Sequence, residues 1–114
     1  MIPAKYNLPT IWRGCDWTPV ILRWKDQNGN PVDLTGWTPS ATADNSYNLN
    51  PVVLDIMNGV TQLSMPAAQT ILIPLGTIAW DWVWTLDSPQ IIYPPILSGI
   101  IPVKQPNTAG GISI

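Results

Sequence analysis

The sequence of 114 residues contains no histidine, no glutamate and no phenylalanine, and its one cysteine is Cys15. Without histidine there is no Ser-His-Asp or Cys-His catalytic site and no imidazole metal ligand. A single cysteine cannot form an internal disulfide, and we expect Cys15 to be a small buried apolar residue. We therefore predict that the protein is not an enzyme and has no catalytic residues, no cofactor and no metal site.

Charge is also scarce, because Asp, Lys and Arg together make up only 11% of the chain, with a net charge of −2. The usual share is about a quarter. No cluster of Lys or Arg marks a nucleic-acid partner or an anionic membrane surface. Proline interrupts the apolar runs well before the ~20 residues that span a bilayer, so we expect no membrane insertion. The N-terminus lacks the apolar core of a signal peptide.

The low content of charged residues has two interpretations, and the composition leaves both open. Either other chains cover much of the surface, or Asn, Gln, Ser and Thr solvate it. The seven aspartates stand singly in turns or on strand faces, where capping and solvation are their usual roles. A small glycan hydrolase that uses two carboxylates is a weaker alternative, because it needs a cleft that a domain of this size rarely builds.

Tryptophan, by contrast, is abundant, with seven residues, and three of them stand in the segment Thr77 to Asp87. At the strand period of two, the apolar side chains of this segment share one face, whereas at the helical period they form no stripe. We predict a central strand whose apolar face is covered by a second layer. The residues of that face are Ile78, Trp80, Trp82, Trp84 and Leu86.

Other short alternating segments are separated by turn signals such as Asn28-Gly29 and Asn58-Gly59. One short helix is expected in Ser64 to Leu72, with Ser64 as its cap. The pattern predicts an all-β fold: a single immunoglobulin-like antiparallel β-sandwich of about seven strands. The remaining strands are expected within Asp16–Lys25, Pro31–Leu34, Trp37–Ala43, Pro51–Met57, Val60–Ser64 and Ile91–Lys104, with a polar loop over Asp44–Asn50.

The composition of the two ends differs from that of the middle. Residues 1–12 contain two prolines and no periodicity, so we expect an extended N-terminal arm. Residues 13–104 are the sandwich, and residues 105–114, with Gly110-Gly111, are a flexible C-terminal tail.

Several short motifs occur in an order that resembles a known family. They are Arg13-Gly14-Cys15-Asp16, Gly29-Asn30-Pro31-Val32-Asp33-Leu34-Thr35-Gly36-Trp37, Asn58-Gly59-Val60, Leu63-Ser64, Trp80-Asp81-Trp82 and Leu97-Ser98-Gly99-Ile100-Ile101-Pro102-Val103. Over residues 13–104 the chain resembles the small immunoglobulin-like domains of tailed-bacteriophage virions, which lie near the baseplate and the tail-fibre attachment.

The resemblance implies a non-enzymatic structural component of a phage tail, an adaptor or decoration protein made in the host cytoplasm and located in the virion. Its partners would be other tail, baseplate or fibre proteins and copies of itself around a symmetry axis. The alternative is a carbohydrate-binding module that contacts host surface glycans through exposed tryptophans.

Candidate interface residues are those whose side chains suit a protein contact. We expect Trp24, Trp37, Trp80 and Trp82 in the core, while the other tryptophans stand nearer strand ends, where an amphipathic ring can anchor a partner. The apolar residues of the arm and the tail can dock on a neighbouring chain. The candidates are Ile2, Tyr6, Trp12, Trp17, Trp84, Ile112 and Ile114.

Overall fold

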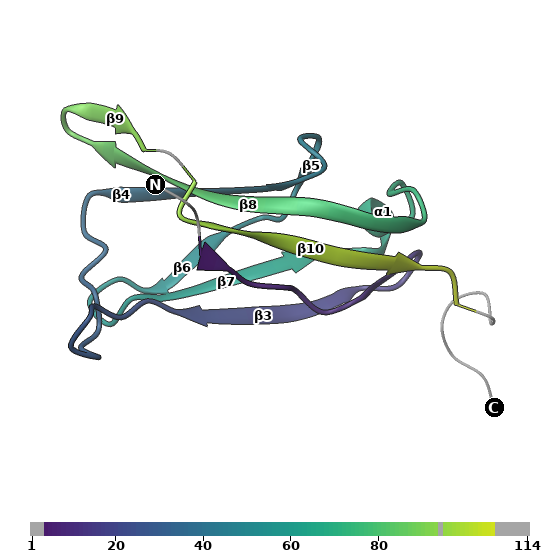
Figure 1. The fold of residues 1–114 in the computed structure, drawn as a ribbon, viewed down its shortest axis with the longest axis horizontal. Helices are drawn as coiled ribbons and strands as arrows, with labels where there is room; N and C mark the ends of the chain where they lie inside the picture. The colour runs from purple at the N-terminus through teal and green to yellow at the C-terminus, as the bar shows by residue number, and fades with distance from the viewer. Residues whose placement is uncertain (1–3, 94, 107–114) are drawn as a thin grey trace.

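The computed structural model describes residues 4–93 and 95–106, which form two β-sheets that face each other (Figure 1). The larger sheet has the order β1-β10-β8-β4-β5, with β2 also on β10 and β9 also on β8, and the smaller has the order β3-β7-β6. The all-β prediction with one short helix is confirmed. The elements are β1 (Ala4–Lys5), β2 (Ile11–Trp12), β3 (Trp17–Arg23), β4 (Trp37–Ala43), β5 (Tyr47–Asn48), β6 (Val52–Asp55), β7 (Val60–Met65), α1 (Ala67–Thr70), β8 (Gly76–Asp87), β9 (Gln90–Ile92) and β10 (Leu97–Lys104).

Strand β8 is the longest strand and occupies the middle of the larger sheet. It pairs with β4 along one side and with β10 and then β9 along the other. Its inward face is the predicted one, because Ile78, Trp80, Trp82 and Trp84 are all buried. Leu86, at the end of the same face, is only half-buried.

The smaller sheet supplies the second layer over this face. In β3, Leu22 is buried while Ile21 and Arg23 are exposed, as the alternation of the segment predicts. The pairing of β3 with β7 shifts register between Trp17 and Val20. Pro19 lies in this interval, where its missing N–H removes no ladder hydrogen bond.

Three expectations about local structure are wrong. The segment Pro31–Leu34 makes only an isolated bridge from Pro31 to Lys25 and forms no strand. Ser64 is not the cap of the short helix, because it belongs to β7; the N-cap residue is Pro66, and the Ala67 N–H donates to the Asp16 carboxylate at 2.7 Å. Cys15 is half-buried rather than buried.

Two further segments differ in detail from their predictions. The polar loop contains β5, which pairs back on Thr42 and Ala43. The expected last strand is divided into β9 and β10, both paired with β8.

The described part of the N-terminal arm, residues 4–12, is extended as expected but belongs to the larger sheet. Strands β1 and β2 both run parallel to β10, along the edge that faces away from β8 (Figure 1). The sheets therefore begin before residue 13, and the sandwich is not wholly antiparallel. The tail, at residues 107–114, lies outside the described residues.

Candidate interaction surfaces

Five aromatic rings form a continuous series from the core to one end of the molecule. Trp82 is fully buried, and its ring lies 5.1 Å from that of Trp24, which lies 5.3 Å from Trp84. Trp37 follows at 6.4 Å from Trp84, and Tyr93 at 5.4 Å from Trp37. The tilted and edge-on geometries are those that aromatic pairs favour. Because Tyr93 is exposed, the series carries the packing of the core out to the surface.

Next to this series is a cavity of about 230 Å³, which we call the Trp hollow. Apart from Lys25, every lining side chain is aromatic or aliphatic, and the Trp24 indole N–H is already bonded to the Thr61 hydroxyl at 2.9 Å. Pockets that hold polar ligands need several convergent polar groups. The Trp hollow therefore suits an apolar side chain. Its lining residues are Trp24, Lys25, Val32, Leu34, Trp37, Trp84 and Ile96.

The hairpin of β8 and β9 projects beyond the body of the molecule (Figure 1). Trp84 in β8 and Ile96, on either side of this hairpin in the sequence, line the Trp hollow. Ile92 is 70% exposed, and Ile91, Tyr93 and Ile96 are exposed as well. Together with the Trp hollow, these residues form what we call the apolar end surface. Exposed apolar side chains that gather in one place mark an interaction site more often than scattered ones.

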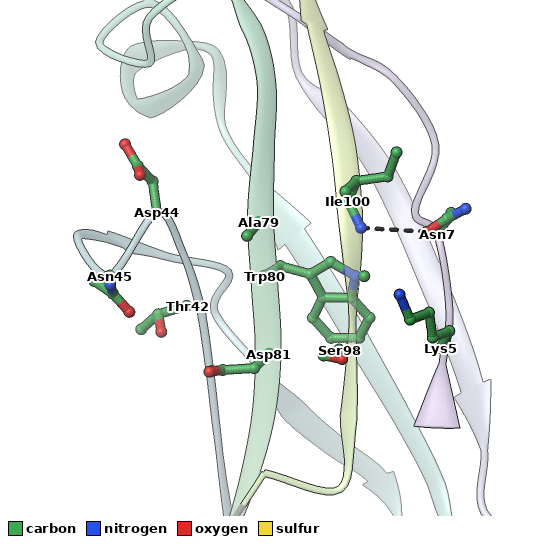
Figure 2. Close-up of a pocket in the computed structure, with 11 residues that line it drawn as sticks. Lys5, Asn7, Thr42, Asp44, Asn45, Ala79, Trp80, Asp81, Ser98 and Ile100 are labelled. Carbon is green, nitrogen blue, oxygen red and sulfur yellow. Dashed lines mark hydrogen bonds between the residues drawn. The ribbon is translucent and has the colours of Figure 1, made fainter. Parts of the chain in front are cut away.

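A second hollow, of about 490 Å³, lies on the outer face of the larger sheet, and we call it the polar groove. Figure 2 shows Lys5 and Asn7 on one side and Asp44 and Asn45 on the other, across β8 and β10. The Ile100 N–H donates to the Asn7 side-chain oxygen at 3.3 Å. The lining residues are Lys5, Asn7, Thr42, Asp44, Asn45, Ala79, Trp80, Asp81, Ser98, Gly99 and Ile100.

The polar groove offers hydrogen-bonding groups but no stacking platform, because the Trp80 ring is only 2% exposed. The Trp hollow and the polar groove thus differ in their lining, whereas a third hollow, of about 550 Å³, places the rings of Tyr6 and Trp24 beside Arg23 and Lys25. Sugar-binding sites combine the two kinds of group, with rings for the apolar faces and polar side chains for the hydroxyls.

The predicted interface residues are not brought together. Tyr6 and Trp12 are 44% and 45% exposed, as an interface role requires, and the Trp12 ring lies 6.0 Å from the Lys104 ammonium nitrogen. Trp17 and Trp84 are buried in the core, and the Trp17 indole N–H donates to the Pro9 carbonyl oxygen at 3.2 Å. Trp17 is therefore a core residue, and Trp84 is a core residue whose ring also lines the Trp hollow. Ile2, Ile112 and Ile114 lie outside the described residues.

The isoleucines and the tyrosine of the β9 hairpin were missed as candidates. The signal was in the sequence, because Ile91-Ile92-Tyr93 places three apolar residues in a row after a short turn. Consecutive residues of a strand point to opposite faces, so such a run cannot be buried entirely on one side.

Two turn aspartates have pKa values below the ordinary one. The Asp33 carboxylate accepts hydrogen bonds from the Thr35 hydroxyl at 2.6 Å and the Thr35 N–H at 2.9 Å, and these lower its pKa. The Asn58 side-chain amide, at 2.8 Å, lowers the pKa of Asp55 in the same way. Both carboxylates hold turns, so their shifted pKa values indicate local structure rather than acid–base chemistry.

Comparison with known proteins assigns the chain to no group. No protein-family model matches the sequence, and no curated protein is significantly similar to it. Within residues 4–93 and 95–106, no helix is long and apolar enough to cross a membrane. The same residues contain no group of three or more His, Cys, Asp or Glu side chains placed to hold a metal ion.

Proposed function

We propose that the protein is a non-enzymatic structural component of a bacteriophage tail. In this proposal it is an immunoglobulin-like adaptor or decoration protein in the region of the baseplate and the tail-fibre attachment. Its partners are other tail proteins and further copies of itself. The resemblance in the sequence motifs supports the phage assignment, and the all-β architecture is compatible with it.

The apolar end surface is the observation that carries the proposal. It combines a rigid aromatic series, a hollow with one charged group and a projecting hairpin whose most exposed residue is Ile92. Protein interfaces are built around buried aromatic and aliphatic anchors in well-packed pockets. Such a contact would form if an apolar side chain of the partner filled the Trp hollow and Ile92 packed into an apolar pocket of the partner.

A glycan-binding module remains the second candidate, and the polar groove is the observation that favours it. The groove presents a lysine, two aspartates, two asparagines and two hydroxyl groups on one face. It ranks below the first candidate because the exposed rings of Tyr6, Trp12 and Tyr93 do not line the polar groove.

The proposal is tested first by the neighbouring genes and then by binding. Tail-fibre and baseplate genes on both sides of this gene support it, and a metabolic operon contradicts it. The products of the adjacent tail genes are then titrated against the wild-type chain and the Ile92→Asp variant. A loss of affinity of about tenfold or more is expected, as for the loss of an apolar anchor.

Gln27→Asp is the matched control for this experiment. It adds the same charge at an exposed position two residues from Lys25, which lines the Trp hollow, but removes no apolar side chain. Its affinity should equal that of the wild type. If both variants bind tail proteins as tightly as the wild type, the apolar end surface is not the contact.

A further inference from the structure

The dipeptide Asn-Gly occurs at Asn28-Gly29 and again at Asn58-Gly59, and both glycines have a positive φ. Asparagine is among the chemically labile residues of proteins. Its side-chain carbonyl can be attacked by the backbone nitrogen of the next residue, and glycine hinders this attack least because it has no Cβ atom. The two dipeptides are identical in sequence, so only their surroundings distinguish their reactivity.

The first dipeptide lies in an exposed turn that leaves it room to move. The Asn28 backbone N–H donates to the Asp26 carboxylate at 2.9 Å, but within the described residues the Asn28 side-chain amide has no hydrogen-bond partner. The Gly29 N–H donates to the Asp26 carbonyl oxygen at 2.9 Å. A Cβ atom at Gly29 would meet nothing within 4 Å beyond its chain neighbours. The Gly29 nitrogen therefore has to release one exposed hydrogen bond to reach the Asn28 side chain.

The second dipeptide is held on both sides. The Asn58 side-chain amide donates to the Asp55 carboxylate at 2.8 Å, and this bond lowers the pKa of Asp55. Gly59 is buried, and a Cβ atom there would lie 2.8 Å from the carbonyl oxygens of Trp24 and Val32. The Gly59 carbonyl oxygen also accepts the Trp24 N–H at 2.8 Å. The peptide group between Asn58 and Gly59 therefore cannot turn toward the side chain without breaking these contacts.

The neighbouring carboxylates separate the two sites further. Attack on an amide carbonyl places negative charge on its oxygen, and a carboxylate bound to the same amide, as Asp55 is to Asn58, opposes that charge. The Asp26 carboxylate is bound instead to the backbone N–H groups of Asn28 and Asn30, at 2.9 and 3.0 Å. Asn28 is thus the more reactive of the two asparagines.

We propose that Asn28 is a site of spontaneous deamidation and that the fold protects Asn58. The Gly29 nitrogen gives its proton to hydroxide and forms a bond to the Asn28 Cγ atom, while the Cγ–Nδ2 bond breaks and ammonia leaves, so that a succinimide ring remains. Water then opens the ring. Attack at the former side-chain carbonyl gives aspartate, and attack at the former backbone carbonyl gives isoaspartate. This inference goes beyond the proposed function and does not depend on it.

The products differ from the original chain in charge and in backbone length. Each conversion replaces a neutral amide with a carboxylate and so adds one negative charge to the net charge of −2. Isoaspartate also adds one carbon atom to the main chain between Lys25 and Pro31, which form a bridge at the base of this turn. Because Lys25 lines the Trp hollow, the modified turn lies beside the apolar end surface.

Ageing of the intact folded chain in mildly alkaline buffer tests the proposal. Chymotryptic peptides that separate residues 28 and 58 are analysed by mass spectrometry, and an isoaspartyl methyltransferase labels isoaspartate. Asn28 should convert at least about tenfold faster than Asn58, because Asn58 must first lose a hydrogen bond to a charged group. Asn28→Gln is the matched control. It should remove the early acidic form seen by ion exchange, since the longer side chain closes its ring less readily.

The same chain unfolded in urea separates the effect of the fold from that of the sequence. Both asparagines should then convert at similar rates. An Asn28 that stays intact in the folded chain, while the unfolded chain loses it, would overturn the proposal. Equal rates at the two sites in the folded chain would also overturn it, as would a difference between the sites that persists unchanged in urea.

Discussion

The Trp hollow is lined by three indole rings, aliphatic side chains and Lys25, whereas most side chains of the polar groove are carboxylates, amides, hydroxyls or the ammonium group of Lys5. Both are concave, but only the first continues the packing of the core. Its walls are held by rings that contact one another back to Trp82. The walls of the groove come from the arm and from a turn. The apolar hollow is therefore suited to a protein anchor and the groove to a polar ligand.

The largest expected effect comes from removing the ring of Trp82, which is the buried end of the aromatic series. Trp82→Ala should lower the free energy of unfolding by about 3–5 kcal/mol, as large-to-small changes at buried sites do. Ile92→Ala, at the exposed end of the same region, should change it by less than about 0.5 kcal/mol. Urea titrations followed by circular dichroism measure both. An unchanged stability in Trp82→Ala would show that the hollow is not continuous with the core.

The next effect concerns the wall of the polar groove. Gly99→Ala should displace the arm, because a Cβ atom there overlaps the Tyr6 carbonyl oxygen. The Trp80 indole N–H, which donates to that oxygen at 2.7 Å, then loses its partner at a cost of about 1–3 kcal/mol. Amide hydrogen exchange of residues 6–12 should become fast while that of β8 stays slow. Ser98→Ala is the control, because it removes a groove side chain and leaves the close approach of Tyr6 to Gly99 unchanged. Slow exchange of the arm in Gly99→Ala would contradict the role given to this glycine.

A smaller effect is expected for ligands of the groove. Titration with host polysaccharide fragments, followed by tryptophan fluorescence and calorimetry, should give no saturable response. Asp81→Asn should leave stability within about 0.5 kcal/mol of the wild type, since Asp81 lies at the groove and not in the core. A saturable response that Asp81→Asn removes would show that the polar groove binds glycans, and the groove rather than the Trp hollow would then be the functional site.

The smallest expected effect is on the dependence of stability on pH. The pKa of Asp33 is lower in the folded chain than the ordinary value of 3.8, so its hydrogen bonds to Thr35 stabilise the fold above that pH. This contribution is lost as the pH falls through the folded pKa, because protonation weakens the bonds. Asp33→Asn should reduce the dependence of the melting temperature on pH below about pH 4. The slope of the profile near neutrality should stay as in the wild type. A profile identical to that of the wild type would show that Asp33 does not contribute to the pH dependence of stability.

Much of the fold could be predicted because the alternation of apolar and polar residues identifies the buried face of a strand. The inward residues of β8 and the wet face of β3 follow from strict alternation. The arm could not be placed, since residues 4–12 show no periodicity and are held by backbone hydrogen bonds to β10, which depend on Gly99 and Trp80. The helix cap also escaped prediction, because Asp16 is distant in sequence from Ala67.

The candidate site was less accessible to sequence reasoning. The positions of Trp84 and Trp17 near strand ends predict surface anchors, but both side chains are buried. Tryptophan alone does not distinguish a core ring from an exposed one, since both need apolar contacts and a partner for the indole N–H. The Trp hollow depends on residues from β4, β8 and the loops near Lys25 and Leu34, which only the tertiary structure brings together.

Hydrogen exchange in the free chain and in the phage particle of the proposed function tests the central claim most directly. The claim is that the apolar end surface joins this protein to its neighbours. Peptides that cover residues 90–93 should exchange at least about tenfold more slowly in the particle than in the free chain, because a contact protects their amides. Unchanged exchange there, with protection confined to the polar groove or to other faces, would contradict it.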